Sequence, residues 1–152
     1  MQTFLTDTSF KTNAQHLDSK RLNKQRVECK QIYAACTGIR EFADGTTLPA
    51  IGWRNHPAVR MWKGHESMLC MYALYICGEC DRRGIADHAG MRSFFMDRMF
   101  RHPFVVPFWW ADAELKTRII TTHRSNLLRK DTTHYGSLFP DLSPSLEYYW
   151  PC

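Results

Sequence analysis

The chain has 152 residues, of which 44% are hydrophobic and 13% aromatic, so it can bury a core and wholesale disorder is excluded. Its net charge of +5 favours an anionic partner, of which nucleic acid is the commonest. The longest apolar runs are far too short to span a membrane, and the first residues lack the basic and apolar regions of a secretory signal.

The first helix is predicted over Asn13–Cys36. Apolar residues recur there at helical spacing, and Gly38 supplies a stop after the last of them. These face-sharing residues are Leu22, Cys29, Ile32, Tyr33 and Cys36. Residues Arg40–Ile51 contain Gly45 and Pro49 and are predicted to form a loop.

The second helix is predicted to begin near His56-Pro57, since proline suits a first helical turn, and to end near Arg82-Arg83-Gly84. It is apolar around much of its circumference, which predicts the central helix of the fold. The aromatic stretch 92–110 should form a short helix followed by irregular chain packed on the core. The alternative for its rings is a platform on which bases stack.

A third long helix is predicted over Asp112–Asp131, with Asp112 as its N-cap. The tail Leu138–Cys152 holds three prolines and should be extended. No alternating strand pattern occurs. We therefore expect an all-α fold: one compact domain over residues 1–152, with about three main helices, long irregular connections and an extended C-terminal tail.

A polar strip lies beside the apolar face of the first helix. Arg21, Lys24 and Glu28 stand at i, i+3 and i+7, and Gln25 lies within the same arc. A carboxylate among cations is what acid–base chemistry on a polyanion needs. Spacing alone favours the simpler interpretation of a solvated helix face with weak ion pairs.

Three segments resemble the pyrimidine-dimer DNA glycosylases, the phage-type enzymes that nick DNA at ultraviolet lesions. They are Leu17 to Leu22 followed by Arg26-Val27-Glu28, the run Gly52-Trp53-Arg54-Asn55-His56-Pro57, and His123 to Asp131 with Tyr148-Tyr149-Trp150-Pro151. The resemblance covers nearly the whole chain and points to a bacterial and phage branch of the superfamily. It implies a DNA glycosylase with AP lyase activity that excises damaged pyrimidines, with Glu28 as the catalytic glutamate.

Two residues depart from the family pattern. The arginine beside the catalytic glutamate falls on Val27, and Arg26 points to another side of the helix, so Arg21 is the better geometric substitute. The family uses an N-terminal α-amine as nucleophile, typically on a small residue exposed by methionine removal. Here Gln2 is bulky, so either the amine of Met1 serves or the mechanism has drifted.

The resemblance also implies a set of DNA contacts. Trp53 is either a wedge between bases or, as is commoner beside a helix start, a core residue; His56 either contacts the substrate or caps its helix. His123, Asn126 and Lys130 share one helix face, which we interpret as a functional polar face. The full set of expected substrate and DNA contacts is Lys24, Gln25, Arg26, Trp53, Arg54, Asn55, His56, His123, Arg124, Asn126, Arg129 and Lys130.

No metal site and no cofactor is expected. Cys77 and Cys80 form a lone CxxC without a second pair, and the cysteines are interpreted as packing groups in a reducing cytoplasm, bacterial or phage-infected. The expected partner is double-stranded DNA, damaged or modified, bound by a monomer. Two alternatives stay open: a glycosylase-fold enzyme that acts on a different modified base or nucleotide, and a non-catalytic DNA-binding module.

Overall fold

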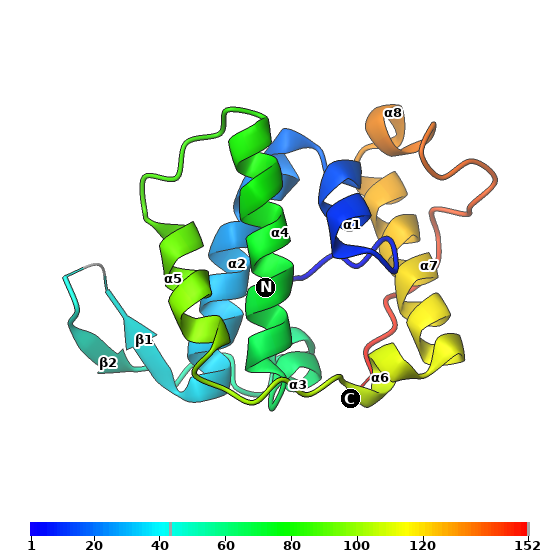
Figure 1. Cartoon of the computed structure of the whole chain (residues 1–152). Coiled ribbons are helices and arrows are strands. Elements are labelled where there is room, and N and C mark those ends of the chain that lie inside the picture. Colours follow the sequence, from blue (N-terminus) through cyan, green and yellow to red (C-terminus); the bar gives the residue numbers. More distant parts are fainter. Residues whose placement is uncertain (43, 152) are drawn as a thin grey trace.

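The computed structural model describes residues 1–42 and 44–151. Within these ranges the chain forms eight helices and one two-stranded antiparallel sheet (Figure 1). The mostly helical fold class is confirmed. The elements are α1 (Phe10–His16), α2 (Ser19–Thr37), β1 (Ile39–Glu41), β2 (Thr47–Pro49), α3 (Pro57–Trp62), α4 (Glu66–Arg82), α5 (Met91–Met99), α6 (Phe108–Ala111), α7 (Ala113–Lys130) and α8 (Thr132–Tyr135).

The prediction of a single first helix is wrong, because the helical conformation is interrupted between α1 and α2. Leu17 is extended at the end of α1, and Asp18 caps α2 by accepting a hydrogen bond of 3.0 Å from the backbone N–H of Arg21. At the other end, Gly38 adopts a left-handed φ of 78° and stops α2 as predicted. The break lets the residues before α1 pass alongside α2.

The loop predicted over Arg40–Ile51 contains a β-hairpin, so the expectation of no strands is wrong. Ile39 pairs with Pro49, and Glu41 pairs with Thr47. The strands have three residues each and are largely exposed, so neither carries a period-two burial pattern. The hairpin lies at one end of the molecule, next to α2 and α5 (Figure 1).

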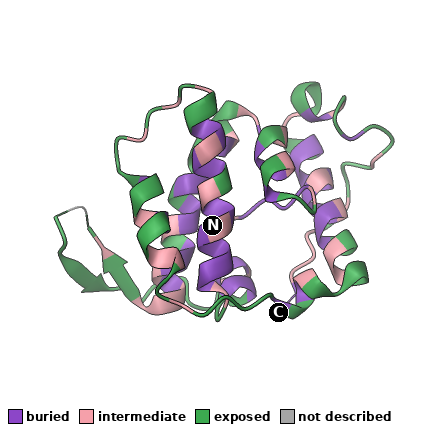
Figure 2. Ribbon diagram, in the orientation of Figure 1, coloured by how far each residue is buried: buried purple, intermediate pink, exposed green. Residues whose placement is uncertain are grey.

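The predicted second helix is two helices, separated where Gly64 takes a φ of 84°. The second of them, α4, packs against α1, α2 and α5, so its central position is confirmed. Figure 2 shows it as the most continuously buried helix. Trp62 at the end of α3 and Tyr72 in α4 are both fully buried within the same core.

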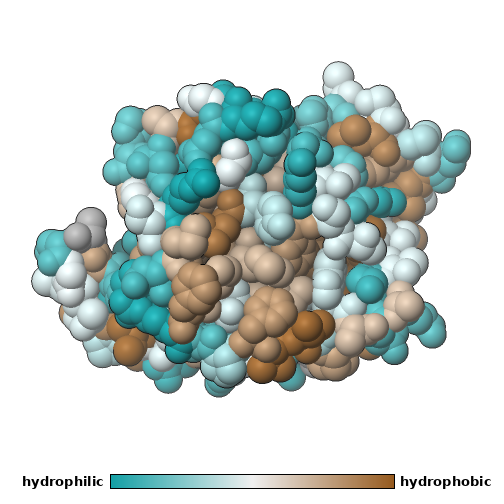
Figure 3. Space-filling model, in the orientation of Figure 1, coloured by the Kyte–Doolittle hydropathy of each residue, from teal (hydrophilic) through white to brown (hydrophobic). Residues whose placement is uncertain are grey.

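The aromatic stretch is divided between core and surface. Phe95 and Trp109 are fully buried, as predicted. Core packing is wrong for Phe100, Phe104 and Phe108, whose side chains are 77%, 56% and 62% exposed. Figure 3 shows apolar side chains gathered toward the lower edge of the molecule, where the segment between α5 and α6 runs.

Helix α7 matches its prediction closely. Asp112 caps it by accepting from the backbone N–H of Leu115 at 2.9 Å, and the tail after α8 returns along α7 without regular structure up to residue 151. The tail is held there by Ser125 of α7, which bonds Ser143 and Leu146. No described helix is long and apolar enough to cross a membrane.

Candidate functional site at the N-terminus

The first residues of the chain pass through the core, and the side chain of Gln25 on α2 forms hydrogen bonds with their backbone. Its side-chain amide donates to the carbonyl of Gln2 at 2.9 Å, while its carbonyl accepts from the N–H of Phe4 at 3.0 Å. Tyr72 braces this arrangement from α4, because its hydroxyl lies 2.8 Å from both the Gln25 carbonyl and the Phe4 carbonyl. A buried amide that bonds two backbone groups of one segment fixes the direction in which that segment runs.

Further polar side chains hold the same segment from other sides. Trp62 donates to the hydroxyl of Thr3 at 2.9 Å, and His123 of α7 accepts from the N–H of Leu5 through Nδ1 at 3.0 Å. Complete burial lowers the pKa of His123 to about 3, so its ring is neutral and able to accept. Residues 3 to 6 are buried throughout. The structure therefore specifies where the α-amino group at Met1 emerges.

Glu28 lies next to Gln25 on α2 and is only 7% exposed. One carboxylate oxygen is 3.5 Å from the Gln25 amide, and the other is 3.4 Å from Nζ of Lys24. The carboxylate borders a cavity of about 410 Å³, which we call the glutamate cavity. Its lining consists of Gln2, Phe4, Lys20, Arg21, Lys24, Gln25, Glu28, Lys130 and Tyr148.

His56 lies close enough to the N-terminal amine and to Glu28 for both charges to affect its imidazole. Burial and the positive charge of the N-terminal amine lower the pKa of His56, and the negative charge of Glu28 opposes them. Its Nδ1 accepts from the N–H of Ala58 at 3.1 Å, so the ring caps α3. The amine, the imidazole and the carboxylate thus belong to one electrostatic cluster.

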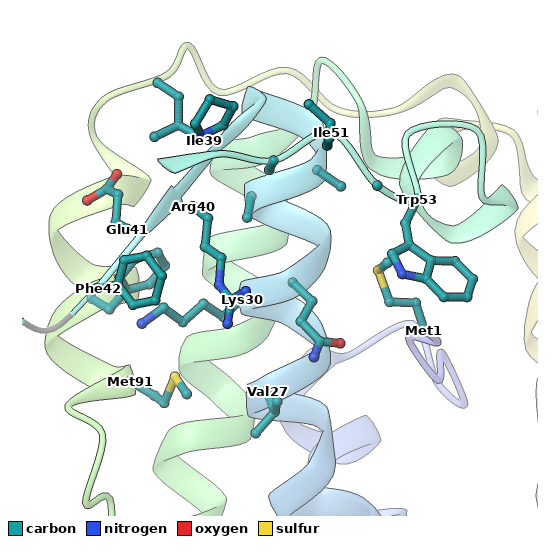
Figure 4. A pocket seen from close by; sticks show the side chains of 17 residues that line it. Met1, Val27, Lys30, Ile39, Arg40, Glu41, Phe42, Ile51, Trp53 and Met91 are labelled. Atoms are coloured by element: carbon teal, nitrogen blue, oxygen red, sulfur yellow. The ribbon is translucent and has the colours of Figure 1, made fainter. Parts of the chain in front are cut away.

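A larger cavity of about 760 Å³ lies between α2, α5 and the β-hairpin, and we call it the hairpin cavity. Met1 and Trp53 lie side by side at one part of it, whereas Arg40, Lys30 and Phe42 gather at another (Figure 4). The glutamate cavity begins at the next residue, since Gln2 lines it. The N-terminal residues therefore lie between the two cavities, each of which is lined by both charged and apolar side chains.

Several predicted site residues are brought together at the glutamate cavity: Arg21, Lys24, Gln25, Glu28 and Lys130. Arg21 is bound on both sides, by Asp18 at 2.6 Å and by the carbonyl of Lys130 at 3.2 Å. The guanidinium of Arg21 is therefore fixed at the rim of the cavity. Met1 and Trp53 line the neighbouring hairpin cavity.

Other predicted DNA contacts are placed elsewhere, and three of them require correction. Arg26 is 4% exposed, and its guanidinium bonds the carbonyl of Ala86 at 3.0 Å. His123 and Asn126 have no exposed surface, so these two members of the expected polar face of α7 are not available to contact DNA, whereas Lys130 is exposed. Both side chains form hydrogen bonds inside the protein. His123 accepts from the backbone N–H of Leu5, and Asn126 donates to the carbonyl of Thr122 at 2.9 Å.

The remaining predicted contacts lie at the surface. Arg54 donates to the carbonyl of Ala50 at 3.0 Å and so ties its loop together, while Asn55 and Arg129 are exposed. One nitrogen of the Arg124 guanidinium is already bonded within the protein, since its Nε donates to the carbonyl of Thr6 at 2.7 Å. Trp53 is 67% exposed, so the core interpretation of this residue is wrong.

The residues predicted from the sequence do not include Lys30, Arg40 and Phe42, although all three line the hairpin cavity. Arg40 and Phe42 reach the hairpin cavity only because the hairpin folds back toward α2, and the exposed strands carry no pattern that predicts this. Lys30 follows Glu28 by two positions, which on a helix turns it away from the polar strip. The CxxC residues are buried in α4, where burial raises the pKa of Cys77 to about 12, so its thiol is a packing group.

Comparison with known proteins gives one match. A family described as pyrimidine dimer DNA glycosylase matches residues 1–93. This range holds α1 to α4, the hairpin, Glu28 and Trp53, whereas α7 and the tail follow it. No curated protein and no solved structure matches the chain.

Proposed function

The chain belongs to the pyrimidine dimer DNA glycosylase family, and we propose that it excises damaged pyrimidines from DNA and then cuts the strand as an AP lyase. The observation that carries this proposal is the buried clamp on residues 3 to 6. It holds Gln2 at the cavity that contains Glu28, which supports a position of the preceding α-amino group close to that carboxylate. An α-amine has an ordinary pKa of about 8, so a useful fraction is a neutral nucleophile at pH 7.

In the first step, the amine nitrogen of Met1 forms a bond to the sugar C1′ while the glycosidic bond breaks and its electron pair leaves with the base. Glu28 stabilises the positive charge that develops on the sugar. It then accepts a proton from the attacking nitrogen and returns one to the ring oxygen, so that the sugar opens to an imine. The departing base takes a proton from solvent.

In the second step, the imine acidifies C2′. Loss of a C2′ proton to Glu28 allows the 3′ phosphate to leave by β-elimination, and water then releases the amine from the sugar. Arg21, Lys24 and Lys130 surround the same cavity and supply positive charge for the adjoining phosphates. No metal or organic cofactor takes part in this sequence.

The test is reaction with an ultraviolet-irradiated duplex in the presence of borohydride, followed by intact-mass and peptide mass spectrometry. We expect a DNA adduct on the N-terminal peptide and none with undamaged duplex. Glu28→Gln should slow strand cleavage by about 10²- to 10⁴-fold, the usual contribution of general acid–base catalysis. The matched control is Glu114→Gln, because Glu114 is an exposed glutamate in the first turn of α7.

Full activity of Glu28→Gln would refute the proposed role of Glu28 in proton transfer and charge stabilisation. Salt-sensitive binding without an adduct or a product would instead identify a non-catalytic DNA-binding module. A short N-terminal extension moves the amine out of the site, so an extended chain that still forms the adduct would exclude the Met1 amine as nucleophile.

A further inference from the structure

Tyr135 of α8 has no exposed surface and lines neither cavity, but its hydroxyl forms two hydrogen bonds with Asp18. The hydroxyl donates to one carboxylate oxygen of Asp18 at 2.6 Å and accepts from the backbone N–H of the same residue at 3.1 Å. A hydroxyl that donates one bond and accepts another has a fixed direction. Tyr135 therefore fixes both the backbone and the side chain of the residue that precedes α2.

Asp18 in turn fixes the side chain of Arg21. The carboxylate oxygen that accepts from Tyr135 also accepts from Nη1 of Arg21 at 2.6 Å. Burial opposes ionisation of Asp18, but the hydrogen bonds from Tyr135 and Arg21 outweigh it and lower the pKa of Asp18 to about 2. The carboxylate is therefore charged at neutral pH, and it binds the guanidinium as an ion.

Tyr135 also contacts Arg21 directly. The guanidinium carbon of Arg21 lies 5.5 Å from the centroid of the Tyr135 ring, which is within the range of a cation–π contact. The ring stacks on Phe139, with an angle of 7° between the two ring planes. One buried side chain thus holds the guanidinium in two ways, by its ring face and, through Asp18, by its hydroxyl.

Arg21 retains hydrogen-bond donors in this arrangement. Nη2 donates to the carbonyl of Lys130 at 3.2 Å, and Nη1 lies 3.6 Å from the carboxylate of Asp131. A guanidinium has five N–H donors, and within residues 1–42 and 44–151 its Nε forms no hydrogen bond. The side chain is 20% exposed and lines the glutamate cavity. A planar cation that is already fixed loses little further entropy when it binds an oxyanion.

We propose, on the basis of the glycosylase function above, that Tyr135 is a positioning residue, which holds Arg21 in the orientation that binds a DNA phosphate beside the attacked sugar. A phosphodiester suits this cation, because its two free oxygens match the geometry of a guanidinium. Tyr135 follows residues 1–93, the range that matches the family. The start of α2 and α8 lie at the same end of the molecule (Figure 1), so the C-terminal part of the chain supports the site on α2.

The experiment is a double-mutant cycle on binding to a duplex that carries a reduced abasic site, which cannot form an imine. Tyr135→Phe keeps the ring and its stack but removes the hydroxyl. It should raise Kd by about 2- to 13-fold, the value of one hydrogen bond. The same change in an Arg21→Ala background should have no further effect, because no guanidinium is left to position.

The salt dependence of binding is a readout that a purely structural role would not move. Arg21→Ala should lower the slope of log Kd against log salt by about 0.9, the value of one phosphate contact, and Tyr135→Phe should lower it by up to that amount. The matched control is Tyr75→Phe, because Tyr75 is 46% exposed on α4 and lines neither cavity. The control should change neither Kd nor the slope.

An equal loss of binding by Tyr135→Phe in both backgrounds would show a structural role and overturn the proposal, and so would an unchanged Kd in the parent background. Urea unfolding of each variant checks that binding is measured on folded protein. If Tyr135→Phe does not fold, Asp18→Asn takes its place in the cycle. It keeps the cap but removes the charge that holds Arg21, so the same two outcomes would overturn the proposal.

The proposed function and the positioning role can fail separately. A parent chain that forms the borohydride adduct while Tyr135→Phe binds normally would refute the positioning role alone. A parent chain that shows the expected cycle but forms no adduct on irradiated duplex would refute the glycosylase function alone. A parent chain that binds neither duplex would refute both.

Discussion

Replacement of Gln25 by leucine tests whether the buried clamp places the amine that we propose as the nucleophile. Leucine has nearly the same size but leaves the Gln2 carbonyl and the Phe4 N–H without their bonds of 2.9 and 3.0 Å. Each unsatisfied buried group costs about 1–3 kcal/mol, so the free energy of unfolding should fall by about 2–6 kcal/mol if the segment stays in place. If the segment moves out instead, stability is partly recovered and the amine is displaced.

Both outcomes should reduce activity, since a displacement of about 1 Å can cost about 10²-fold in rate. The assay is single-turnover incision of an abasic duplex, which needs the amine and no base pocket, together with urea unfolding. The control is Gln15→Ala, because Gln15 is an exposed glutamine on α1. Near-normal rates and unchanged stability in Gln25→Leu would refute the clamp.

Three further predictions follow from single groups. Burial lowers the folded pKa of His123 to about 3 from the ordinary 6.5, so the unfolded chain binds the extra proton and stability should fall as pH drops from about 6.5 toward 3. The slope, about 1.4 kcal/mol per pH unit, should be missing in urea titrations of His123→Gln, and an equal slope in the variant would contradict this. Asp18→Ala removes the cap of α2 and two side-chain bonds, so urea unfolding should show a loss of about 2–4 kcal/mol, whereas Asp18→Asn keeps the cap and should lose less; equal losses would show that the cap contributes nothing. Lys24→Ala should lower the slope of log Kd against log salt by about 0.9, whereas Lys11→Ala on α1 should leave it unchanged, and an equal change in both would exclude a specific phosphate contact at Lys24.

The long helices could be predicted because their signals are local. Asp112 is a cap followed by apolar residues at helical spacing, and Gly38 is a stop, so α7 and the end of α2 lie where the sequence places them. The break before α2 was also encoded, since Asp18 is a capping residue, but the apolar periodicity continues through it. The hairpin had no such signal, because its short strands bury almost nothing.

The interior role of the polar residues could not be predicted for a different reason. His123 and Asn126 stand at i and i+3 on α7, a spacing that a solvated or DNA-facing strip would share. What decides their burial is the backbone of residues 3 to 6, which lies at the opposite end of the sequence. Glu28 was predicted from family resemblance, whereas the contacts that hold residues 2 to 5 became visible only in three dimensions.

The bond between Leu5 and His123 joins positions 118 residues apart, and this separation governs when the N-terminal segment becomes fixed during folding. A contact of such range forms only after the intervening chain has been brought together, which makes it late and slow. During synthesis the N-terminus emerges first, yet its partner on α7 follows near the end. On the mechanism proposed above, the amine would therefore be synthesised first and positioned last, and a nascent chain would not yet attack DNA.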